Sequence, residues 1–406
     1  MSSSESETTQ NIIDDFNTDC NDLKDKYTYI PSNLNNIKRI IAIGDIHGDL
    51  NVAINMLVAG KCILDISKKK INNNEFVSII DNKDVERKFI WIGKETVVVQ
   101  VGDQVDRCRP TSHNECIYPS TTINDEASDI KILNFYTNVD IIAKKQGGCV
   151  ISLLGNHELM NVQGNLKYVS AKGLLEFVNL ANVKNLSEME QLKLGQDNRR
   201  KAFTNNNNMQ LNKFLACSRT SAIIINGLLF VHGGMIKKMA ESYNIIDINL
   251  FVRKWLLGKL NSELEQVAYT NQEKEAKLNN KSVKLSLHKR IDELLNNSNS
   301  IFWNRLLGNI PSDSNSTSNV TDLCDDYLKD VFNIYNINGI IIGHTPQINN
   351  NYGINSACNK KVWRVDIGAS TAFDAIRNIN YKRIEVLEIT FDDSTFLKPI
   401  FKIIPL

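Results

Sequence analysis

Short apolar runs rich in β-branched residues, each followed by glycine and polar residues, recur along the chain from Lys38 onward. Their composition and short length predict buried strands rather than helices. The predicted strands are residues 38–45, 96–102, 149–154, 222–231 and 339–343, followed by 362–367, 384–391 and 397–404. Intervening segments such as 127–146 and 199–217 have a helical spacing of apolar residues. This alternation of strands and helices predicts a layered α/β fold.

The residues outside this pattern are predicted to form an extension and three insertions. Residues 1–36 are polar and acidic, which predicts a disordered or loosely attached extension. Residues 37–406 are predicted to form a single domain, interrupted near 68–88, 261–299 and 312–319 by charged or Ser/Asn-rich sequence. We expect the second insertion to be an exposed helical hairpin, with a cap over the site as the alternative.

Composition and charge exclude several classes of function. The 406 residues are 42% hydrophobic, which is enough for a sizeable core, and a net charge of +1 gives no basic field for nucleic acid or a membrane surface. No run reaches the ~18 apolar residues of a membrane-spanning helix. The first residues lack the positive start and apolar stretch of a secretory signal. We therefore expect a cytoplasmic protein whose eight cysteines are reduced thiols. The sequence does not indicate an oligomeric state.

Each of the first five predicted strands is followed by a polar turn. The turns read GDIHGD from Gly44, GDQVDR from Gly102, GNHE from Gly155, HGG from His232 and GHTP from Gly343. Ligands of open α/β sheets bind at such strand ends. Four of the six histidines lie in these turns, and imidazole together with carboxylate oxygens suits zinc, iron or manganese. A shared carboxylate can hold two ions about 3.5–4 Å apart, the spacing used for displacement at phosphorus.

The ordered motifs resemble those of the calcineurin-like metallophosphoesterases, and within them the phosphoprotein phosphatase family, over residues 38–374. Residues 153–170, 228–235 and 343–374 are similar to the Shewanella-like protein phosphatases. The resemblance implies an α/β fold built as a β-sandwich of two mixed sheets flanked by helices. It also implies two divalent metal ions (manganese, iron or zinc) and a phosphoprotein substrate.

The resemblance assigns a role to individual residues of the turns. Asp103 would bridge the two metal ions, and Asn156 would both bind the second metal and contact phosphate. His157, paired with Asp106, would protonate the leaving oxygen, and Arg107 would grip the phosphate. The complete set of implied metal ligands is Asp45, His47, Asp103, Asn156, His232 and His344.

Five further polar residues have less direct assignments. A second phosphate-binding arginine is expected, and Arg305 is the first candidate and Arg364 the second; an ordinary helix-surface position is the alternative for Arg305. Lys167 stands where the family usually has arginine, which puts a substrate contact there in doubt. Asp49 is a candidate for orienting a metal ligand, and Asp366 is expected to be structural or to orient a ligand as well.

The chain departs from the family pattern after Arg107, where Cys108 replaces the usual glycine. The loop that follows, residues 109–128, contains His113 and Cys116. The three side chains of Cys108, His113 and Cys116 are candidates for a small metal clip or a redox pair. A loop with free thiols is the simpler interpretation.

The motifs together predict a metal-dependent phosphomonoesterase that acts on phosphoproteins through a hydroxide held between two metals, with phosphotyrosine favoured over phosphoserine and phosphothreonine. The alternative is a hydrolase of dinucleoside polyphosphates or other nucleotides, because such enzymes share the metal motifs. An inactive scaffold with this fold is the more distant alternative. It would have at least one broken metal ligand, whereas all six positions are intact.

Overall fold

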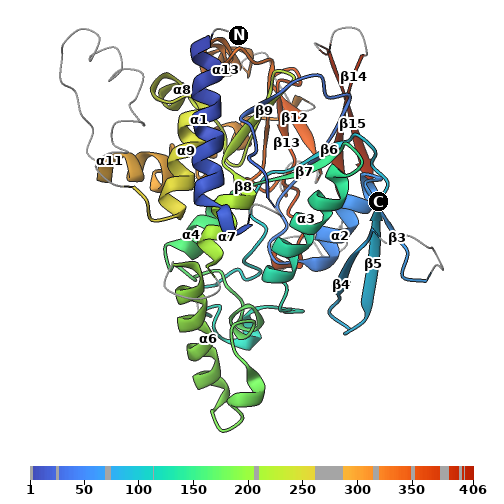
Figure 1. Cartoon of the computed structure of the whole chain (residues 1–406), viewed down its shortest axis with the longest axis vertical. Coiled ribbons are helices and arrows are strands. Elements are labelled where there is room, and N and C mark those ends of the chain that lie inside the picture. The colour runs from blue at the N-terminus through green and yellow to red at the C-terminus, as the bar shows by residue number, and fades with distance from the viewer. Residues whose placement is uncertain are drawn as a thin grey trace.

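Two six-stranded sheets, packed face to face and flanked by helices, make up the body of the molecule (Figure 1). The computed structural model describes residues 3–23, 27–68, 75–112, 114–204, 210–260, 287–313, 320–348, 353–374, 384–392, 396 and 398–406. Apolar side chains from both sheets share one buried cluster, which includes Ile41, Val98, Phe230 and Ile341. The predicted α/β sandwich of two mixed sheets is confirmed.

The first sheet contains the three predicted strands that precede the first three polar turns. Its strand order is β15-β14-β2-β6-β7-β8. The four strands from β2 to β8 run parallel, whereas β14 is antiparallel to β2 and to β15. The strands are β2 (Arg39–Ile43), β6 (Val97–Gln100), β7 (Cys149–Leu153), β8 (Arg219–Thr220), β14 (Glu385–Phe391) and β15 (Pro399–Pro405).

The second sheet contains the strands that precede the last two turns, in the order β1-β9-β10-β11-β13-β12. The segment 222–231, predicted as one strand, is a hairpin. Its turn residues Asn226 and Gly227 have φ angles of 49° and 75°, the conformation that Asn-Gly favours in a two-residue hairpin turn. The strands are β1 (Asn33–Leu34), β9 (Ala222–Ile225), β10 (Leu228–Val231), β11 (Gly339–Ile342), β12 (Asn355–Ala357) and β13 (Val362–Arg364).

Helices cover the outer faces of both sheets (Figure 1). Residues of α2 (Leu50–Ala59) and α3 (Asp129–Lys144) share the first apolar cluster with β2, β6 and β7. A second apolar cluster joins β10 and β11 to α7, α8, α9 and α13. The remaining helices are α4 (Asn156–Val162), α5 (Ala171–Leu175), α6 (Glu188–Phe203), α7 (Leu211–Ser218), α8 (Lys237–Ser242), α9 (Ile245–Leu256), α11 (Leu287–Ile291), α12 (Leu306–Asn309) and α13 (Val320–Tyr335).

The three predicted insertions are described in part. A small sheet of β3 (Ile63–Asp65), β5 (Glu86–Trp91) and β4 (Val77–Ile80) includes residues 77–80 and 86–88 of the first one. Residues 69–74, 261–286 and 314–319 of the three insertions lie outside the described residues, as does His113.

The N-terminal segment, where the sequence predicted a disordered or loosely attached extension, includes a helix that contacts the body. Helix α1 (Ser3–Asp19) lies beside α9 (Figure 1). Asp15 is 2.8 Å from the guanidinium of Arg253 and 2.6 Å from the ammonium of Lys254, and Asp19 is also 2.6 Å from Lys254. The acidic residues that suggested a solvated tail are therefore counterions of buried cations on α9.

Six of the eight cysteines form disulfides, so the prediction of reduced thiols is wrong. Cys62 and Cys149 are the two free cysteines. Disulfides rarely persist in a reducing compartment, so this pairing does not fit a cytoplasmic location, which stays a prediction. The disulfides are Cys20–Cys217, Cys108–Cys116 and Cys324–Cys358.

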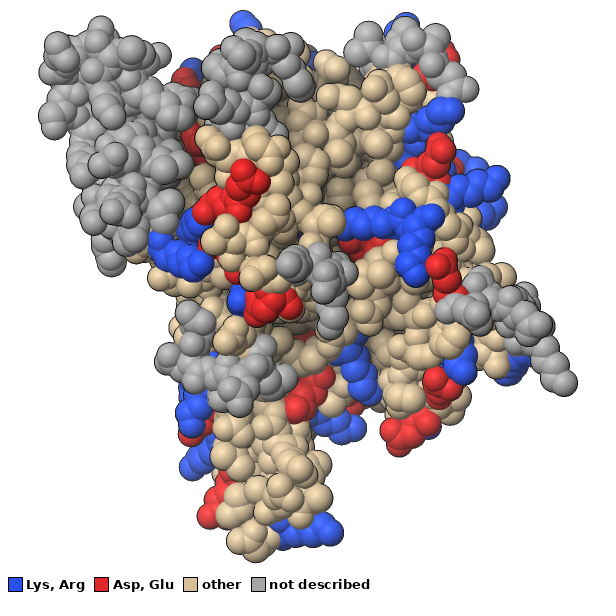
Figure 2. All heavy atoms as spheres, in the orientation of Figure 1, with Lys and Arg blue, Asp and Glu red and all other residues tan. Residues whose placement is uncertain are grey.

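The described residues on the face seen in Figure 2 do not form a large region of one charge. Figure 2 shows acidic and basic side chains interspersed over the visible face, in keeping with the net charge of +1. None of the helices in the described part of the chain combines the length and the apolar character that crossing a bilayer takes.

The disulfide pattern predicts a thiol count. Unfolded in guanidinium without reductant, the protein should expose two thiols, from Cys62 and Cys149, and eight after reduction. Burial raises the pKa of both free thiols to about 12, so the folded protein should not react with iodoacetamide near pH 8. Mass spectrometry of alkylated protein checks this, and eight alkylated cysteines without reductant would contradict the pairing.

Candidate metal centre and active site

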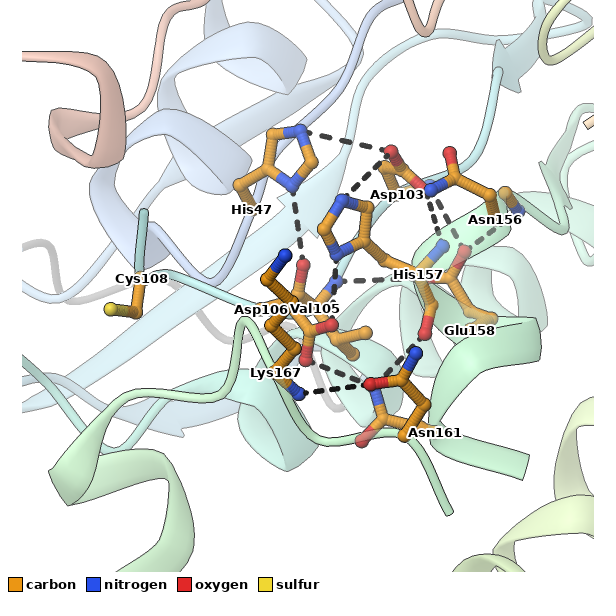
Figure 3. Close-up of polar contacts among 12 residues, drawn as sticks. His47, Asp103, Val105, Asp106, Cys108, Asn156, His157, Glu158, Asn161 and Lys167 are labelled. Atoms are coloured by element: carbon orange, nitrogen blue, oxygen red, sulfur yellow. Dashed lines mark hydrogen bonds and ion pairs between the residues drawn. The ribbon is translucent and has the colours of Figure 1, made fainter. Parts of the chain in front are cut away.

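The five polar turns converge at the carboxyl ends of five strands that lie next to one another. Strands β2, β6 and β7 are parallel neighbours in one sheet, and β10 and β11 are parallel neighbours in the other. Since the ends of parallel strands meet at the same edge of a sheet, the side chains that follow them are brought together between the two sheets. Figure 3 shows part of this cluster, with Asp103 and His157 near its middle.

Several of these residues have a left-handed backbone conformation, which sets the direction of their side chains. His47, Asp103, Asp106 and His344 have φ angles of 46°, 54°, 73° and 64°. Residues other than glycine rarely adopt this left-handed region, and strained conformations of this kind cluster at active sites. The turns therefore hold strained conformations at the residues that the motifs identified.

Asp103 is the central side chain of the cluster. Its Oδ2 atom lies 3.7 Å from Nε2 of His47, 3.8 Å from Nε2 of His157 and 3.3 Å from Nε2 of His232. All four side chains are buried. Burial raises the pKa of Asp103, but the nearby imidazoles of His232 and His157 outweigh it and hold the pKa well below its usual range.

Two groups of potential ligands share Asp103. One consists of His47, Asp103 and His157, and the other of Asp103, His232 and His344; within each group the ligand atoms lie within 4.8 Å of one another. Asp45 and Asn156 adjoin these groups. Oδ2 of Asp45 is 3.8 Å from Nε2 of His47, and Oδ1 of Asn156 is 3.0 Å from Nε2 of His232. The structure thus brings together all six predicted metal ligands.

The electrostatics of the cluster fit divalent cations. Burial and the carboxylates of Asp366 and Asp103 raise the pKa of Asp45 well above its usual value, and Oδ2 of Asp366 is buried without a hydrogen-bond partner. Burial lowers the pKa of His47 and of His344, which favours the neutral imidazole that metals bind. A positive ion would relieve the carboxylate repulsion without displacing a proton from either ring.

His157 is held by a buried hydrogen-bond chain. Its Nδ1 atom lies 2.8 Å from Oδ2 of Asp106. The other carboxylate oxygen of Asp106 accepts hydrogen bonds from Nδ2 of Asn161 at 2.9 Å and from Nη2 of Arg199 at 3.4 Å. Arg199 is fully buried and also donates to Asp129 at 2.7 Å. Sequence reasoning missed Asn161 and Arg199; Asn161 lies one helical turn beyond His157, which is a weak signal, and Arg199 has no sequence signal.

Glu158 fixes the shape of two turns at once. Its carboxylate accepts hydrogen bonds from four backbone N–H groups, those of Gly155 at 2.7 Å, Asp103 at 3.0 Å, Gln104 at 2.7 Å and Val105 at 3.3 Å. The turn after β6 and the turn after β7 are therefore tied to one buried side chain, which was predicted only as part of the Asn-His-Glu motif.

Arg107 lies beside the cluster, but its guanidinium is committed to other protein groups. Nη1 donates to the backbone oxygen of Gly48 at 3.0 Å and to the carboxylate of Glu126. Nη2 donates to the backbone oxygen of Asn124 at 2.9 Å and to the hydroxyl of Thr371. Among the described residues, Nε of Arg107 is buried and has no hydrogen-bond partner.

Asp49 belongs to the same network as Arg107. It caps α2 by accepting from the backbone N–H of Val52 at 3.1 Å, and its other oxygen accepts from the backbone N–H of Thr371 at 3.0 Å. Nη1 of Arg107 is 3.4 Å away. Asp49 therefore orients the loop beside the cluster instead of contacting a predicted ligand.

The other three basic residues that the sequence singled out have different surroundings. Arg305 is exposed, and its Nη1 donates to the backbone oxygen of His344 at 2.6 Å, which places it at the edge of the cluster. Arg364 is buried and donates to Asn355 and to backbone oxygens of the loop that follows α12, so its role is structural. Lys167 is exposed and lies over the ring of Tyr168.

A family model described as calcineurin-like phosphoesterase matches residues 38–347 of the chain. A protein of Acanthamoeba polyphaga mimivirus, named uncharacterized protein R398, is 34% identical over 269 residues, which cover 63% of this chain and 93% of the viral protein. Shewanella-like protein phosphatase 2 of Arabidopsis thaliana is 26% identical over 358 residues, which cover 82% of this chain and 72% of the plant protein.

Among solved structures, a cold-active protein tyrosine phosphatase has a similar fold. The TM-score is 0.51 at 19% sequence identity, and the match covers 92% of this chain and 80% of that chain. At this level of identity the likeness is one of fold.

The four hydrogen bonds of Glu158 predict a stability effect. Glu158→Gln places an amide NH₂ where backbone N–H groups now point, and it should lower the free energy of unfolding by about 2–4 kcal/mol. Urea unfolding without reductant checks this against Glu95→Gln, a matched change at an exposed position that should cost less than about 0.5 kcal/mol. Equal stabilities of the two variants would contradict the role given to Glu158.

Proposed function

The chain belongs to the calcineurin-like phosphoesterase family, and from this premise we propose that it is a metal-dependent phosphatase of phosphoproteins. The observation that carries the proposal is the convergence on Asp103 of two groups of potential metal ligands, one of which contains His157, a histidine held by a carboxylate. A phosphomonoesterase needs these two components, a cationic centre for the phosphoryl group and a proton donor for the leaving oxygen.

Six residues would hold the metal ions. Asp45 and His47 would bind the first ion, Asn156, His232 and His344 the second, and Asp103 would bind both. Manganese, iron and zinc all accept this mixture of oxygen and nitrogen ligands. When bound, such ions act as Lewis acids that polarise phosphoryl oxygens and lower the pKa of water.

His157 is proposed as the general acid. Because a carboxylate can only accept, the 2.8 Å contact with Asp106 assigns the proton of this pair to Nδ1 of His157. Asn161 and Arg199 donate to the other oxygen of Asp106, which fixes the carboxylate against the ring. With Nδ1 held by Asp106, Nε2 of His157 is the atom that would donate a proton to the leaving oxygen.

The relatives support phosphoproteins as the substrate class. Two of the matching proteins are named Shewanella-like protein phosphatases, from Arabidopsis thaliana and Plasmodium berghei. We propose phosphotyrosine as the preferred residue, which follows the resemblance of residues 153–170, 228–235 and 343–374 to this group.

The first test of the proposal is a substrate panel. Chelator-treated protein with added Mn²⁺, kept free of reductant because of its disulfides, should hydrolyse phosphotyrosine peptides faster than matched phosphoserine or phosphothreonine peptides. Initial rates of phosphate release measure this. Faster hydrolysis of diadenosine tetraphosphate would overturn the substrate class, and no activity with manganese, iron or zinc would overturn the enzymatic proposal.

The second test removes the shared ligand. Asp103→Asn should reduce the bound metal per chain and lower kcat/KM by at least about 100-fold, since even groups that only orient metal ligands cost 10–100-fold when lost. Metal analysis by mass spectrometry and steady-state rates check this. Asp197→Asn, at an exposed position on α6, is the control and should change neither. Full activity of Asp103→Asn would refute the site.

The third test isolates the acid. His157→Asn should slow the hydrolysis of an alkyl phosphate, a poor leaving group, by about 10²–10⁴-fold. The leaving oxygen of an aryl phosphate with an acidic phenol needs less protonation. Hydrolysis of that substrate by the variant should therefore slow much less. A plot of log kcat against leaving-group pKa for both proteins measures the change of slope, and equal losses on all substrates would contradict an acid role for His157.

A further inference from the structure

Asp366 lies at the carboxyl end of a sixth strand, beside the five strands that lead into the polar turns. Strand β13 runs parallel to β11 with Arg364 opposite Ile342, and the backbone N–H of Val365 continues this pairing by donating to the oxygen of Ile342 at 2.9 Å. Beyond this point β11 leads into the turn of His344, and β13 leads into Asp366. Because the ends of parallel strands meet at the same edge of a sheet, Asp366 belongs to the same group of strand ends as the metal ligands.

The turn after β2 packs directly against the backbone of Asp366. A Cβ atom at Gly44 would overlap the backbone oxygen of Val365 and would lie 3.0 Å from the backbone nitrogen of Asp366. Glycine is required where two backbones approach each other so closely. Asp45, the residue after Gly44, and Asp366 are therefore brought together from opposite sheets.

One carboxylate oxygen of Asp366 is bound and the other is free. Oδ1 accepts a hydrogen bond from the backbone N–H of Gly368 at 2.9 Å. Oδ2 is buried and has no hydrogen-bond partner among the described residues. Since Asp366 is only 1% exposed, bulk solvent does not reach this oxygen. A buried charged oxygen without a partner is costly, and a cation beside it would remove that cost.

The charges around Asp366 are those of the metal centre. Burial raises the pKa of Asp366 and the carboxylate of Asp103 raises it further, against the lowering effects of the Gly368 N–H and of nearby cationic groups. Asp366 in turn contributes most to raising the pKa of Asp45, after burial itself. Three buried carboxylates, those of Asp45, Asp103 and Asp366, therefore act on one another.

A carboxylate with a purely structural role has different surroundings in this chain. Glu158 is also buried, and it accepts hydrogen bonds from four backbone N–H groups. Asp366 accepts one and lies beside a second carboxylate. These surroundings suit a residue whose missing partner is a bound cation.

We propose that Asp366 is a seventh residue of the metal centre, with its free Oδ2 atom turned toward the divalent cation that Asp45 binds. The charge of Asp366 strengthens the binding of that cation, and the cation satisfies the oxygen that the protein leaves without a partner. The six ligands already assigned keep their roles. The inference rests on the metal centre of the proposed function and adds to it a residue from a sixth strand.

Metal affinity tests the proposal independently of activity. Isothermal titration calorimetry of chelator-treated protein with Mn²⁺ should show one site whose Kd is about 10- to 100-fold higher in Asp366→Asn than in the unmodified chain, the loss typical of residues that support metal ligands. Asparagine keeps the shape of the side chain and an oxygen for the N–H of Gly368. Asp19→Asn, the same change at a buried aspartate far from these turns in the sequence, is the control and should bind Mn²⁺ with unchanged affinity.

The stability of the metal-free protein distinguishes a metal-site residue from a structural one. Asp366→Asn removes one of three buried carboxylates that repel one another, so the midpoint of urea unfolding without metal should rise while Mn²⁺ affinity falls. Asp19→Asn removes the charge that faces Lys254 and Lys259, and its midpoint should fall.

A second variant and the metal-free midpoint keep the proposal falsifiable. Asp366→Ala lacks the carboxylate and should lose Mn²⁺ affinity as Asp366→Asn does. Unchanged Mn²⁺ affinity in both variants would overturn the proposal. A lower metal-free midpoint of Asp366→Asn, or the failure of both variants to fold without metal, would also overturn it, because either result identifies Asp366 as a structural residue.

These outcomes are separable from those of the proposed function. If Mn²⁺ binding depends on Asp366 but the unmodified chain does not hydrolyse phosphopeptides, the phosphatase proposal fails and the role of Asp366 stands. If phosphopeptides are hydrolysed and Asp366→Asn binds Mn²⁺ with unchanged affinity, the function stands and Asp366 is excluded from the metal centre.

Discussion

The repulsion between buried carboxylates is the constraint on which the site depends. Asp45, Asp103 and Asp366 are each at most 2% exposed, and their mutual repulsion contributes to raising the pKa of Asp45. A fold can hold such groups in its interior only with compensating charge and fixed hydrogen bonds. The imidazoles of His232 and His157 hold the pKa of Asp103 down, and divalent cations bound by the six candidate ligands would supply positive charge in place of a proton on His232. The strained turns, and the strand ends from which they start, form the scaffold that holds these carboxylates in place.

The ligand set was predictable because the family's chemistry is local in sequence. Each turn follows a strand that its β-branched residues identify, so the place of Asp103 or His232 at a sheet edge follows from a short motif. The supporting residues are not local. Arg199 is 93 residues from Asp106, to which it donates, and an arginine in an amphipathic helix is normally read as a surface residue. Glu158 is part of the Asn-His-Glu motif, but the hydrogen bonds that it accepts from four backbone N–H groups depend on the three-dimensional course of two turns.

The N-terminal helix and the disulfides show a second limit of sequence reasoning. Polar composition predicted a solvated tail, but Asp15 and Asp19 find cationic partners on α9 that are 238 and 235 residues away. Cys20 and Cys217 are 197 residues apart. Pairs at such separations leave no periodic or spacing signal, and the even number of cysteines alone does not distinguish paired from free thiols. The prediction of reduced thiols, which followed from the lack of an export signal, was wrong for the same reason.

Arg107 and Arg109, the two arginines after Asp106, have different surroundings. Arg107 donates from both terminal nitrogens to neighbours from three parts of the chain, which suits a residue that joins loops. Arg109 packs on the rings of Phe373 and Tyr168, which in turn contact His47 and His157. Cys108, at the position where the family pattern has glycine, anchors this loop through a disulfide to Cys116. A change in the covalent structure of the loop thus leaves the six candidate ligands of the turns in place.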